Sequence, residues 1–439
     1  MDVADLMAGI DTLDPYKRYG KVTRVVGLTV ESNGPPKTSV GDVCYIHIAR
    51  SGRTVKAEIV GFRDEKVLLM PFHSVHEISP GSFVESTGMP LEIKVGPQLI
   101  GKILDSDGKL FNGGALPSGL SSFSVDNVPP NPLERPRIQQ PIELGVRAID
   151  GLLTVGKGQR VGIFAGSGVG KSTLLGMIAR NTNADLNVIA LIGERGREVR
   201  EFIERDLGEE GLKNSIVVVA TSDRPALMRI KGAMTATAIA EYFRDCGKDV
   251  LLMMDSVTRV AMAQREIGLA VGEPPTTKGY TPSVFAMLPR LLERSGTNRY
   301  GSITAFYTVL VDGDDMDEPI SDAVRGILDG HFVLNRKLAN KGQYPAVDLL
   351  SSVSRVMKDI VSDDHQHAAE RFREWLSIYN DSEDLINIGA YKKGTSARVD
   401  KAIEHFPQMQ EFIKQSVNEK TSLNDSVQEL ISQYGKGGS

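Results

Sequence analysis

The stretch AGSGVGKST at residues 165–173 follows the apolar run RVGIF at 160–164 and precedes LLGMI at 174–178. This order predicts a strand, a glycine-rich loop and a helix, the setting in which a P-loop binds phosphate. Backbone N–H groups of such a loop surround an anion, and the N-terminus of the helix adds a positive dipole end. Ala165 stands where the usual pattern has its first glycine. The sequence therefore predicts a nucleotide-phosphate site at this loop.

Two side chains of the loop have predicted roles of their own. Lys171 can reach the β- and γ-phosphates, and Ser172 can offer its hydroxyl to Mg²⁺. An ordinary glycine-rich turn is the alternative, but it does not explain why strand, lysine–serine pair and helix occur together. The remaining loop residues are predicted to contact the nucleotide, and they are Gly166, Ser167, Gly168, Val169, Gly170 and Thr173.

The overall composition is typical of a globular protein. Of 439 residues, 41% are hydrophobic and 24% are charged, which suits about three domains of ordinary size. The net charge of −5 gives no electrostatic case for nucleic acid as the main partner. No apolar run reaches the ~18 residues of a membrane span, and the N-terminus does not read as a signal peptide. We therefore expect a cytoplasmic protein that contacts a membrane only through partners.

Three features resemble other kinds of site, and none is predicted to bind a metal. Cys44 and Cys246 lie far apart in the sequence and are predicted to be free, buried thiols in a reducing cytoplasm. His365 and His367 do not share a helix face and are predicted to lie at the surface. The run DGDDMDE at 312–318 lacks the spacing of a calcium loop and is predicted to be a solvated acidic loop.

The first 141 residues predict four segments of different kinds. Residues 1–13 have apolar residues at helical spacing and predict a short amphipathic helix. From 20 to about 90, short apolar runs alternate with turn residues, which predicts a small all-β domain, a barrel. The segment 101–114 predicts a further hairpin, and five prolines within 126–141 predict an extended linker.

The rest of the chain predicts an α/β domain followed by helices. Between about 142 and 355, strands alternate with helices, which is typical of a mostly parallel sheet. After 360 the pattern is helical throughout. The predicted strands of the sheet are 160–164, 187–192, 215–220, 249–254, 302–311 and 331–335.

Two acidic residues follow predicted strands of this sheet. Asp255 ends the apolar run 250–254, which suits a Walker B acid that organises Mg²⁺. Glu194 follows the run 187–192, and in a parallel sheet it would lie at the same edge as the P-loop. Glu194 is therefore a candidate to orient the attacking water, although GERGRE in isolation would by default be interpreted as a solvated charged loop.

Two further residues are candidates whose roles the residues alone leave open. Arg355, in the run SVSRV, is a candidate for stabilising transition-state charge, but a lone arginine is usually a surface residue. Tyr344 precedes a proline and could stack on adenine, but a plain turn tyrosine fits equally well.

Taken together, the motifs identify a family. AGSGVGKST, GERGREV, LLMMDSVTRVAMAQREIG, PPTTKGYTPSVFAMLPRLLERSG and YPAVDLLSSVSRVM occur in this order. In this set the chain resembles the type III secretion ATPases, above all their flagellar export branch, which is related to the catalytic subunit of rotary ATP synthases. The resemblance spans about residues 20–435.

The resemblance implies a multidomain fold and a ring. The expected parts are an N-terminal partner-binding helix (1–19), a β-barrel (20–92), a RecA-like α/β P-loop ATPase core with its linker (93–360) and an α-helical C-terminal domain (361–439). The family works as a ring of six identical subunits with ATP sites at the interfaces, and its cofactors are ATP and Mg²⁺.

The resemblance also assigns roles to residues. Lys171 and Ser172 would bind phosphate and Mg²⁺, Glu194 would position water, Asp255 would be the Walker B acid, and Arg259 would line the site behind it. Two more catalytic-loop assignments complete the set, Arg195 in catalysis and Glu198 at the metal with Ser172 and Asp255.

Two roles that rotary synthases divide between different chains fall on this one chain. Tyr344 matches the position where the family packs an aromatic ring on adenine. Arg355 matches the arginine finger, which acts on the nucleotide of the neighbouring subunit. One chain that carries both roles fits a homohexamer.

The expected function is ATP hydrolysis that assists flagellar protein export by releasing and unfolding chaperone-bound substrates. The implied partners are a regulator or stator protein on the N-terminal helix, a coiled-coil stalk protein in the pore, the export gate and chaperone–substrate complexes. The run GAYKKGTSAR at 389–398 is basic where rotary catalytic subunits carry an acidic run, which favours export over synthesis.

Several alternatives stay open at this point. A virulence-type secretion ATPase shares the same motifs. The ring could instead serve as a docking platform with ATP turnover secondary. A Rho-type RNA helicase is also a hexameric ring but needs a basic RNA channel, and a rotary synthase subunit needs a partner nucleotide-binding chain.

Overall fold

The computed structural model describes residues 17–48, 51–73, 76–311 and 316–435. The predicted helix at 1–13 and the first residues of the predicted acidic loop at 312–318 lie outside these ranges. The chain divides into two compact units, Met1–Glu92 with Pro225–Leu227 and Glu266–Pro274, and the remainder from Ile93. Among the described residues, no helix is long and apolar enough to cross a membrane.

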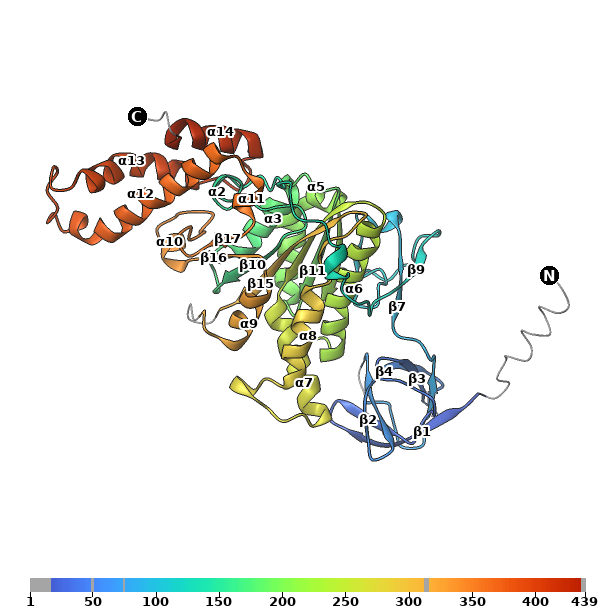
Figure 1. Cartoon of the computed structure of the whole chain (residues 1–439). Coiled ribbons are helices and arrows are strands. Elements are labelled where there is room, and N and C mark those ends of the chain that lie inside the picture. The colour runs from blue at the N-terminus through green and yellow to red at the C-terminus, as the bar shows by residue number, and fades with distance from the viewer. Residues whose placement is uncertain (1–16, 49–50, 74–75, 312–315, 436–439) are drawn as a thin grey trace. The chain divides into compact units, whose positions relative to one another are not determined.

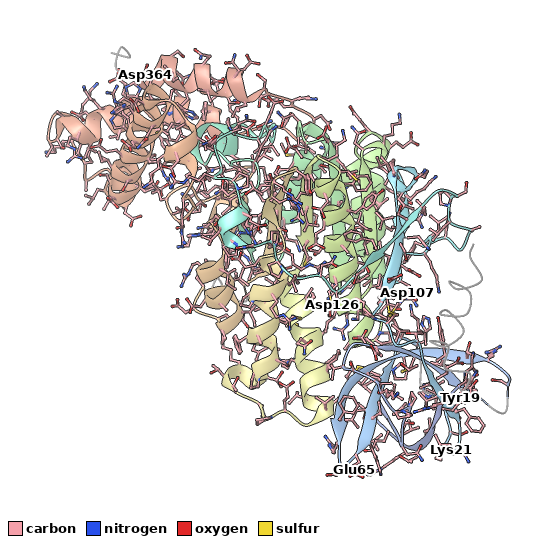
Figure 2. All side chains as sticks on the ribbon, turned by 45° about the vertical axis from the view of Figure 1, so that its right-hand side comes forward. Tyr19, Lys21, Glu65, Asp107, Asp126 and Asp364 are labelled. Carbon is pink, nitrogen blue, oxygen red and sulfur yellow. The ribbon has the colours of Figure 1, made fainter. Side chains whose placement is uncertain are left out.

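The first unit contains the predicted β-barrel. Its wall is closed by antiparallel strands in the order β1 (Tyr19–Val26), β2 (Thr29–Ser32), β5 (Lys66–Pro71), β4 (Thr54–Arg63), β3 (Val43–His47) and β6 (Phe83–Ser86). Side chains alternate between a buried interior and an exposed exterior, as a half-buried strand requires. Tyr19 and Lys21, for example, lie on the outer surface (Figure 2), whereas Val30, Ile46 and Leu69 are fully buried inside.

The second unit is built on a mostly parallel sheet flanked by helices (Figure 1). The strand order is β17 (Val353–Ser354), β16 (Gly330–Leu334), β10 (Arg160–Ala165), β15 (Ser302–Leu310), β13 (Asp249–Asp255), β11 (Leu186–Ile192), β12 (Ser215–Ala220) and β8 (Ile103–Leu104). Every residue of β11 and β12 is buried, because helices cover both faces of a parallel sheet. The predicted strands and their parallel arrangement are confirmed.

Helices and short strands fill the connections of this unit. The longer helices are α3 (Lys171–Asn181), α6 (Ala226–Asp245), α7 (Val257–Val271), α8 (Pro282–Leu292) and α9 (Pro319–Ile327). The shorter elements are β7 (Glu92–Val95), β9 (Ser121–Ser124), α2 (Arg147–Leu152), α4 (Gly196–Glu201), the π-helical turn η3 (Phe202–Leu207), α5 (Gly208–Lys213), β14 (Gly296–Thr297), α10 (Arg336–Asn340), α11 (Met357–Ile360) and the 3₁₀ turns η1 (Pro97–Leu99), η2 (Pro132–Glu134) and η4 (Thr277–Gly279).

The segment 101–114 forms the predicted hairpin turn and, in addition, a strand pairing that was not predicted. Leu104 and Leu110 make an antiparallel bridge, so the tight turn is present. However, β8 also pairs in parallel with β12 and becomes the outermost strand of the large sheet. A two-residue strand carries too little periodicity for this long-range pairing to be read from the sequence.

The C-terminal region is helical, as predicted, with α12 (Asp363–Asn387), α13 (Ala397–Ile413) and α14 (Leu423–Tyr434). Phe372 packs against Phe412 and Tyr434, with ring centroids 5.7 and 5.0 Å apart. Gln415 ties this region to the nucleotide domain at three points. Its side chain accepts the N–H of Arg147 at 2.8 Å and donates to the Gly145 carbonyl at 2.9 Å, while its own N–H donates to the Tyr344 carbonyl at 3.0 Å.

Two burial predictions are wrong. His365 is only 3% exposed, and its Nε2 lies 2.6 Å from the Gly151 carbonyl oxygen, so burial lowers the pKa of the imidazole. His367 is exposed as predicted. Cys44 is buried, and burial raises its pKa to about 11, but Cys246 is exposed. Burial in both cases depends on whether a segment distant in the sequence packs over the residue. Local spacing does not reveal this.

Candidate active site

The predicted P-loop has the expected local geometry. Strand β10 ends at Ala165 and helix α3 begins at Lys171. Between them, Gly168 and Gly170 have φ angles of 76° and 85°, in the left-handed region that favours glycine. Gly170 also leaves room for a ring, because a Cβ there would lie 3.3 Å from Cε1 of Tyr344. The loop is therefore a strand-to-helix turn with its backbone available to an anion.

A cavity of about 470 Å³ opens at this loop, a size usual for small-molecule sites. It is lined by segments from four neighbouring strands of the sheet, where β10, β15, β13 and β11 end. Most of the predicted site residues line it, namely Gly166, Ser167, Gly168, Gly170, Lys171, Ser172, Thr173, Glu194, Arg195, Glu198, Asp255 and Arg259. Val169 does not, because its side chain is buried in the core beneath the loop.

Lys171 and two carboxylates form the centre of the cavity. The Lys171 ammonium lies 2.5 Å from Asp255 Oδ1 and 3.7 Å from Glu194 Oε1. Burial by itself lowers the pKa of Lys171, but the two carboxylates outweigh it and raise that pKa. Lys171 is therefore a fixed positive charge at the place where an anionic ligand would enter, and phosphate oxygens would compete with Asp255 for it.

Glu194 has the environment of a general base. Burial and the neighbouring charge of Asp255 raise the pKa of its carboxyl to about 7. A hydrogen bond shared with Glu198 acts in the same direction on Glu194 and lowers the pKa of Glu198. A base with a pKa near the working pH can both take and release a proton efficiently. The arrangement therefore suits activation of a water molecule.

Arg259 supplies a buried donor. Its Nε is buried and has no hydrogen-bond partner among the described residues. The side chain packs against Gly193, where a Cβ would lie 2.7 Å from that of Arg259, so the sequence permits this close approach only with glycine. An unsatisfied buried donor is costly unless a ligand completes it, and an anion in the cavity would do so.

The predicted metal ligands provide the oxygen chemistry that Mg²⁺ prefers. The carboxylates of Asp255 and Glu198 and the hydroxyl of Ser172 all belong to residues that line the cavity. Across the part of the chain that the structure describes, no group of three or more His, Cys, Asp or Glu residues could hold a metal by itself. A magnesium ion here would thus take its other ligands from phosphate and water, as is usual for this ion.

Tyr344 lies beside the P-loop rather than in the phosphate cavity. Its ring contacts the position of Gly170, and 45% of the residue is exposed. Nearby, Arg336 donates a hydrogen bond to the Ser167 carbonyl at 3.1 Å. The exposed ring next to the phosphate loop is where a base attached to those phosphates could stack.

Arg355 is far from the cavity of its own chain. Ser354 pairs with Gly330 at the beginning of β16, and the N–H of Arg355 donates to the Asp329 carbonyl at 3.1 Å. Asp329 in turn donates to the carbonyl of Arg160, the first residue of β10. The P-loop follows Ala165, five residues further along β10, which is roughly 16 Å at about 3.3 Å per residue. Arg355 and the P-loop thus lie at opposite ends of one strand.

Sequence reasoning missed several residues of the cavity. Thr308 donates a hydrogen bond to Asp255 Oδ1 at 2.7 Å and so helps to orient this carboxylate. Its only signal was a polar residue inside the apolar run of β15. Thr308 supports the cavity without lining it, whereas Val199, Phe202 and Arg205 line it from α4 and η3. Val199 is the last residue of the motif GERGREV but was given no role, and no motif marked Phe202 and Arg205.

Comparison with known proteins identifies matching regions along most of the chain. Residues 145–354 match the nucleotide-binding domain of the ATP synthase alpha/beta family, and residues 22–88 match the beta-barrel domain of that family. Residues 361–432 match the T3SS EscN ATPase C-terminal domain.

Relatives of known name match over nearly the full length. A flagellum-specific ATP synthase of Bacillus subtilis is 64% identical over 436 residues, which cover 99% of each chain. The flagellum-specific ATP synthase of Salmonella typhimurium is 48% identical, covering 95% of this chain and 94% of the relative. A type 3 secretion system ATPase of Xanthomonas euvesicatoria is 50% identical, covering 96% and 95%.

A solved structure shares the fold. The assembled ATPase EscN in complex with its central stalk EscO, from the type III secretion system of enteropathogenic E. coli, superposes with a TM-score of 0.87. It is 47% identical and covers 94% of this chain and 99% of that chain. The barrel, nucleotide core and helical region described above are therefore those of this known architecture.

Proposed function

The chain belongs to the ATP synthase alpha/beta family, in the branch of flagellum-specific ATP synthases and type 3 secretion system ATPases, and is an ATP-hydrolysing enzyme. From this premise we propose that it works as a ring of six identical subunits that cleaves ATP to ADP and phosphate in support of flagellar protein export. The 64% identity to the flagellum-specific ATP synthase of Bacillus subtilis, against 50% to the type 3 secretion system ATPase of Xanthomonas euvesicatoria, supports the flagellar role over the virulence role.

One observation carries the proposal. Each chain holds a complete phosphate cavity at one end of its sheet and the candidate charge stabiliser, Arg355, at the other end. A single copy cannot bring the two together, because they are separated by the length of β10. A second copy that presents its Arg355 edge to the cavity completes the site, and a closed ring gives every subunit one such neighbour.

The site residues then have complementary roles. Lys171 leaves Asp255 to bind the β- and γ-phosphates, while the loop N–H groups and Arg259 donate to phosphate oxygens. Ser172, Asp255 and Glu198 hold Mg²⁺, which neutralises charge on the phosphates when bound.

The remaining residues act on water and on the rest of the nucleotide. Glu194 accepts a proton from the attacking water, and its raised pKa suits that task. Arg195, exposed at the mouth of the cavity, and Arg355 of the neighbouring subunit stabilise charge on the leaving and transferring phosphates. Tyr344 packs on adenine beside Gly170.

One of the proposed partners has support from a solved relative. A stalk protein in the pore corresponds to the central stalk EscO that is present with EscN. A regulator on the N-terminal helix, the export gate and chaperone–substrate complexes complete the proposal, together with a location at the cytoplasmic face of the membrane.

A mixing experiment tests the ring and the assignment of Arg355 together. Lys171→Ala and Arg355→Ala proteins are each expected to be nearly inactive. When they are mixed, an intact cavity of one faces an intact Arg355 of the other, and ATPase activity should reappear. Wild-type specific activity should also rise with protein concentration as rings form. Concentration-independent activity, with no recovery in rings shown by native mass spectrometry to be mixed, would refute action across the interface.

A further inference from the structure

A dense cluster of charges surrounds the start of β10, at the end of the sheet away from the cavity. Arg160 donates to both carboxylate oxygens of Asp329, from Nε at 3.0 Å and from an Nη at 3.1 Å, and its backbone N–H donates to the same carboxylate at 3.1 Å. Its other Nη lies 2.5 Å from Glu293. Arg160 is thereby held between two carboxylates with its side chain only 14% exposed.

A second arginine closes the cluster from the proline-rich linker. Arg135 lies 3.4 Å from the Glu293 carboxylate and donates to the carbonyls of Glu293 and Ser295 at 2.5 and 2.9 Å. The linker that the sequence predicted as merely extended is thus anchored to the same charges. The cluster joins four segments that are distant in the sequence.

Arg355 is attached directly to this cluster. The carbonyl of Asp329 accepts the N–H of Arg355 at 3.1 Å and a hydrogen bond from Gln159 Nε2 at 3.2 Å. Gln159 also donates to Ser354 Oγ at 3.1 Å, on the residue before Arg355. The backbone from which Arg355 projects is therefore fixed by Asp329, while the Arg355 side chain is exposed.

We propose that Asp329 is a positioning residue for ATP hydrolysis, which through its pairing with Arg160 fixes the segment that presents Arg355 to the nucleotide of the neighbouring subunit. This inference rests on the trans role of Arg355 proposed above. Three hydrogen bonds from Arg160 to one carboxylate are more than a strand connection needs, since β10 and β16 already pair in parallel over Gly162–Ala165. Bidentate pairing supplies direction as well as attraction.

The expected effect is on turnover. Misplacing a catalytic group by about 1 Å can cost ~10²-fold in rate. Asp329→Asn replaces one acceptor oxygen by an amide donor that faces the donors of Arg160. We expect its turnover in rings to fall roughly 10- to 10²-fold, with KM for ATP and binding of a fluorescent ATP analogue to the dilute protein unchanged.

A matched control exists on the same edge of the sheet. Asp249 begins β13, its side chain is 31% exposed against 28% for Asp329, and it pairs with Lys157 at 2.6 Å. Asp249 makes none of the contacts that hold Arg355. Asp249→Asn is therefore expected to keep turnover within roughly twofold, as the loss of one partly exposed ion pair should.

The decisive measurement assigns Asp329 to one side of the interface. Asp329→Asn protein is mixed with Lys171→Ala protein, which contributes an intact Asp329 and Arg355, and separately with Arg355→Ala protein, which does not contribute an intact finger. The proposal expects recovery of activity with Lys171→Ala and none with Arg355→Ala. A residue with a merely structural role would give equal results in both mixtures.

The outcomes separate this inference from the proposal on which it rests. If Lys171→Ala and Arg355→Ala recover activity together but Asp329→Asn behaves like Asp249→Asn, positioning by Asp329 is refuted and the trans role stands. If that first pair does not recover activity, both are refuted. If Asp329→Asn does not fold, Arg160→Lys is used instead, because it removes the bidentate pairing with Asp329 but keeps the positive charge. The proposal requires that it shows the same pattern in the mixtures.

Discussion

The charged side chains at the two ends of the central sheet differ in how fully they are paired with one another. At the carboxyl end, Lys171 pairs with the carboxylates of Asp255 and Glu194, and burial together with the charge of Asp255 raises the pKa of Glu194 to about 7. At the amino end, Arg160 and Asp329 satisfy each other through several hydrogen bonds. The comparison shows that one end leaves binding capacity for a ligand, whereas the other uses its charges to fix the backbone.

The largest effect on turnover is expected at the amino end of the sheet, from Arg355, although this residue does not line the cavity of its own chain. Arg355→Ala should lower turnover by roughly 10³- to 10⁵-fold, the value typical of a charge stabiliser supplied by a neighbour. ATP binding by the dilute variant should be unchanged, because Arg355 does not line the cavity. Single-turnover kinetics and nucleotide titration measure the two quantities. Weakened ATP binding by the dilute variant would mean that Arg355 contributes to the site of its own subunit. That result would contradict the proposed separation of roles between the two ends of the sheet.

The next largest effect is expected at the carboxyl end. Glu194→Gln keeps the shape of the side chain and removes the base, so turnover should fall by about 10²- to 10⁴-fold. Affinity for ATP should stay near that of the wild type, and equilibrium titration of the variant provides the internal control. Loss of ATP affinity with normal turnover per bound ATP would instead make Glu194 a binding residue.

The same carboxylate predicts a pH dependence. Burial and the charge of Asp255 raise the pKa of Glu194 to about 7, so its carboxyl gains a proton as the pH falls through that value. A protonated carboxyl cannot act as a base, and kcat/KM, which reports on the free enzyme, should therefore fall below about pH 7. A pH profile of the wild type should show this acidic limb, and the profile of Glu194→Gln should lack it. An identical limb in both proteins would assign it to another group.

The smallest effect concerns stability at the amino end. Burial alone raises the pKa of Asp249, but its hydrogen bonds from Lys157 and Ser302 outweigh burial and lower it. A carboxyl with a lowered folded pKa stabilises above its unfolded pKa of about 3.9 and loses this contribution as the pH falls through the folded pKa. Asp249→Asn should thus cost ~0.2–1 kcal/mol at neutral pH. Urea unfolding at neutral and acidic pH should show the difference shrink at low pH.

Much of the carboxyl end could be predicted from the sequence because its parts are local. AGSGVGKST is contiguous, Asp255 ends an apolar strand, and Glu194 lies two residues beyond the end of another, so parallel pairing places both at the same edge of the sheet. Thr308 escaped prediction because its role depends on the register of β15 against β13.

The amino end could not be predicted in the same way. Arg160 and Asp329 are 169 positions apart, and Arg135 reaches Glu293 from a linker that looks featureless. The burial of His365 likewise comes from the carbonyl of Gly151, on a helix more than two hundred positions away. Local periodicity does not predict such pairings, because they form between distant segments only when the sheet is assembled.

The three hydrogen bonds that join Gln415 to the nucleotide domain have a mechanical consequence. They lead to Gly145, Arg147 and Tyr344, which come from two separate segments of the nucleotide domain. Contacts with two separate segments restrict rotation of the C-terminal region about the point of attachment. A single contact would leave that rotation free. Gln415 is also only 5% exposed, so water cannot easily replace these bonds. Because one of these bonds ends on Tyr344, next to the P-loop, a displacement of α13 and α14 is expected to reach the edge of the nucleotide site.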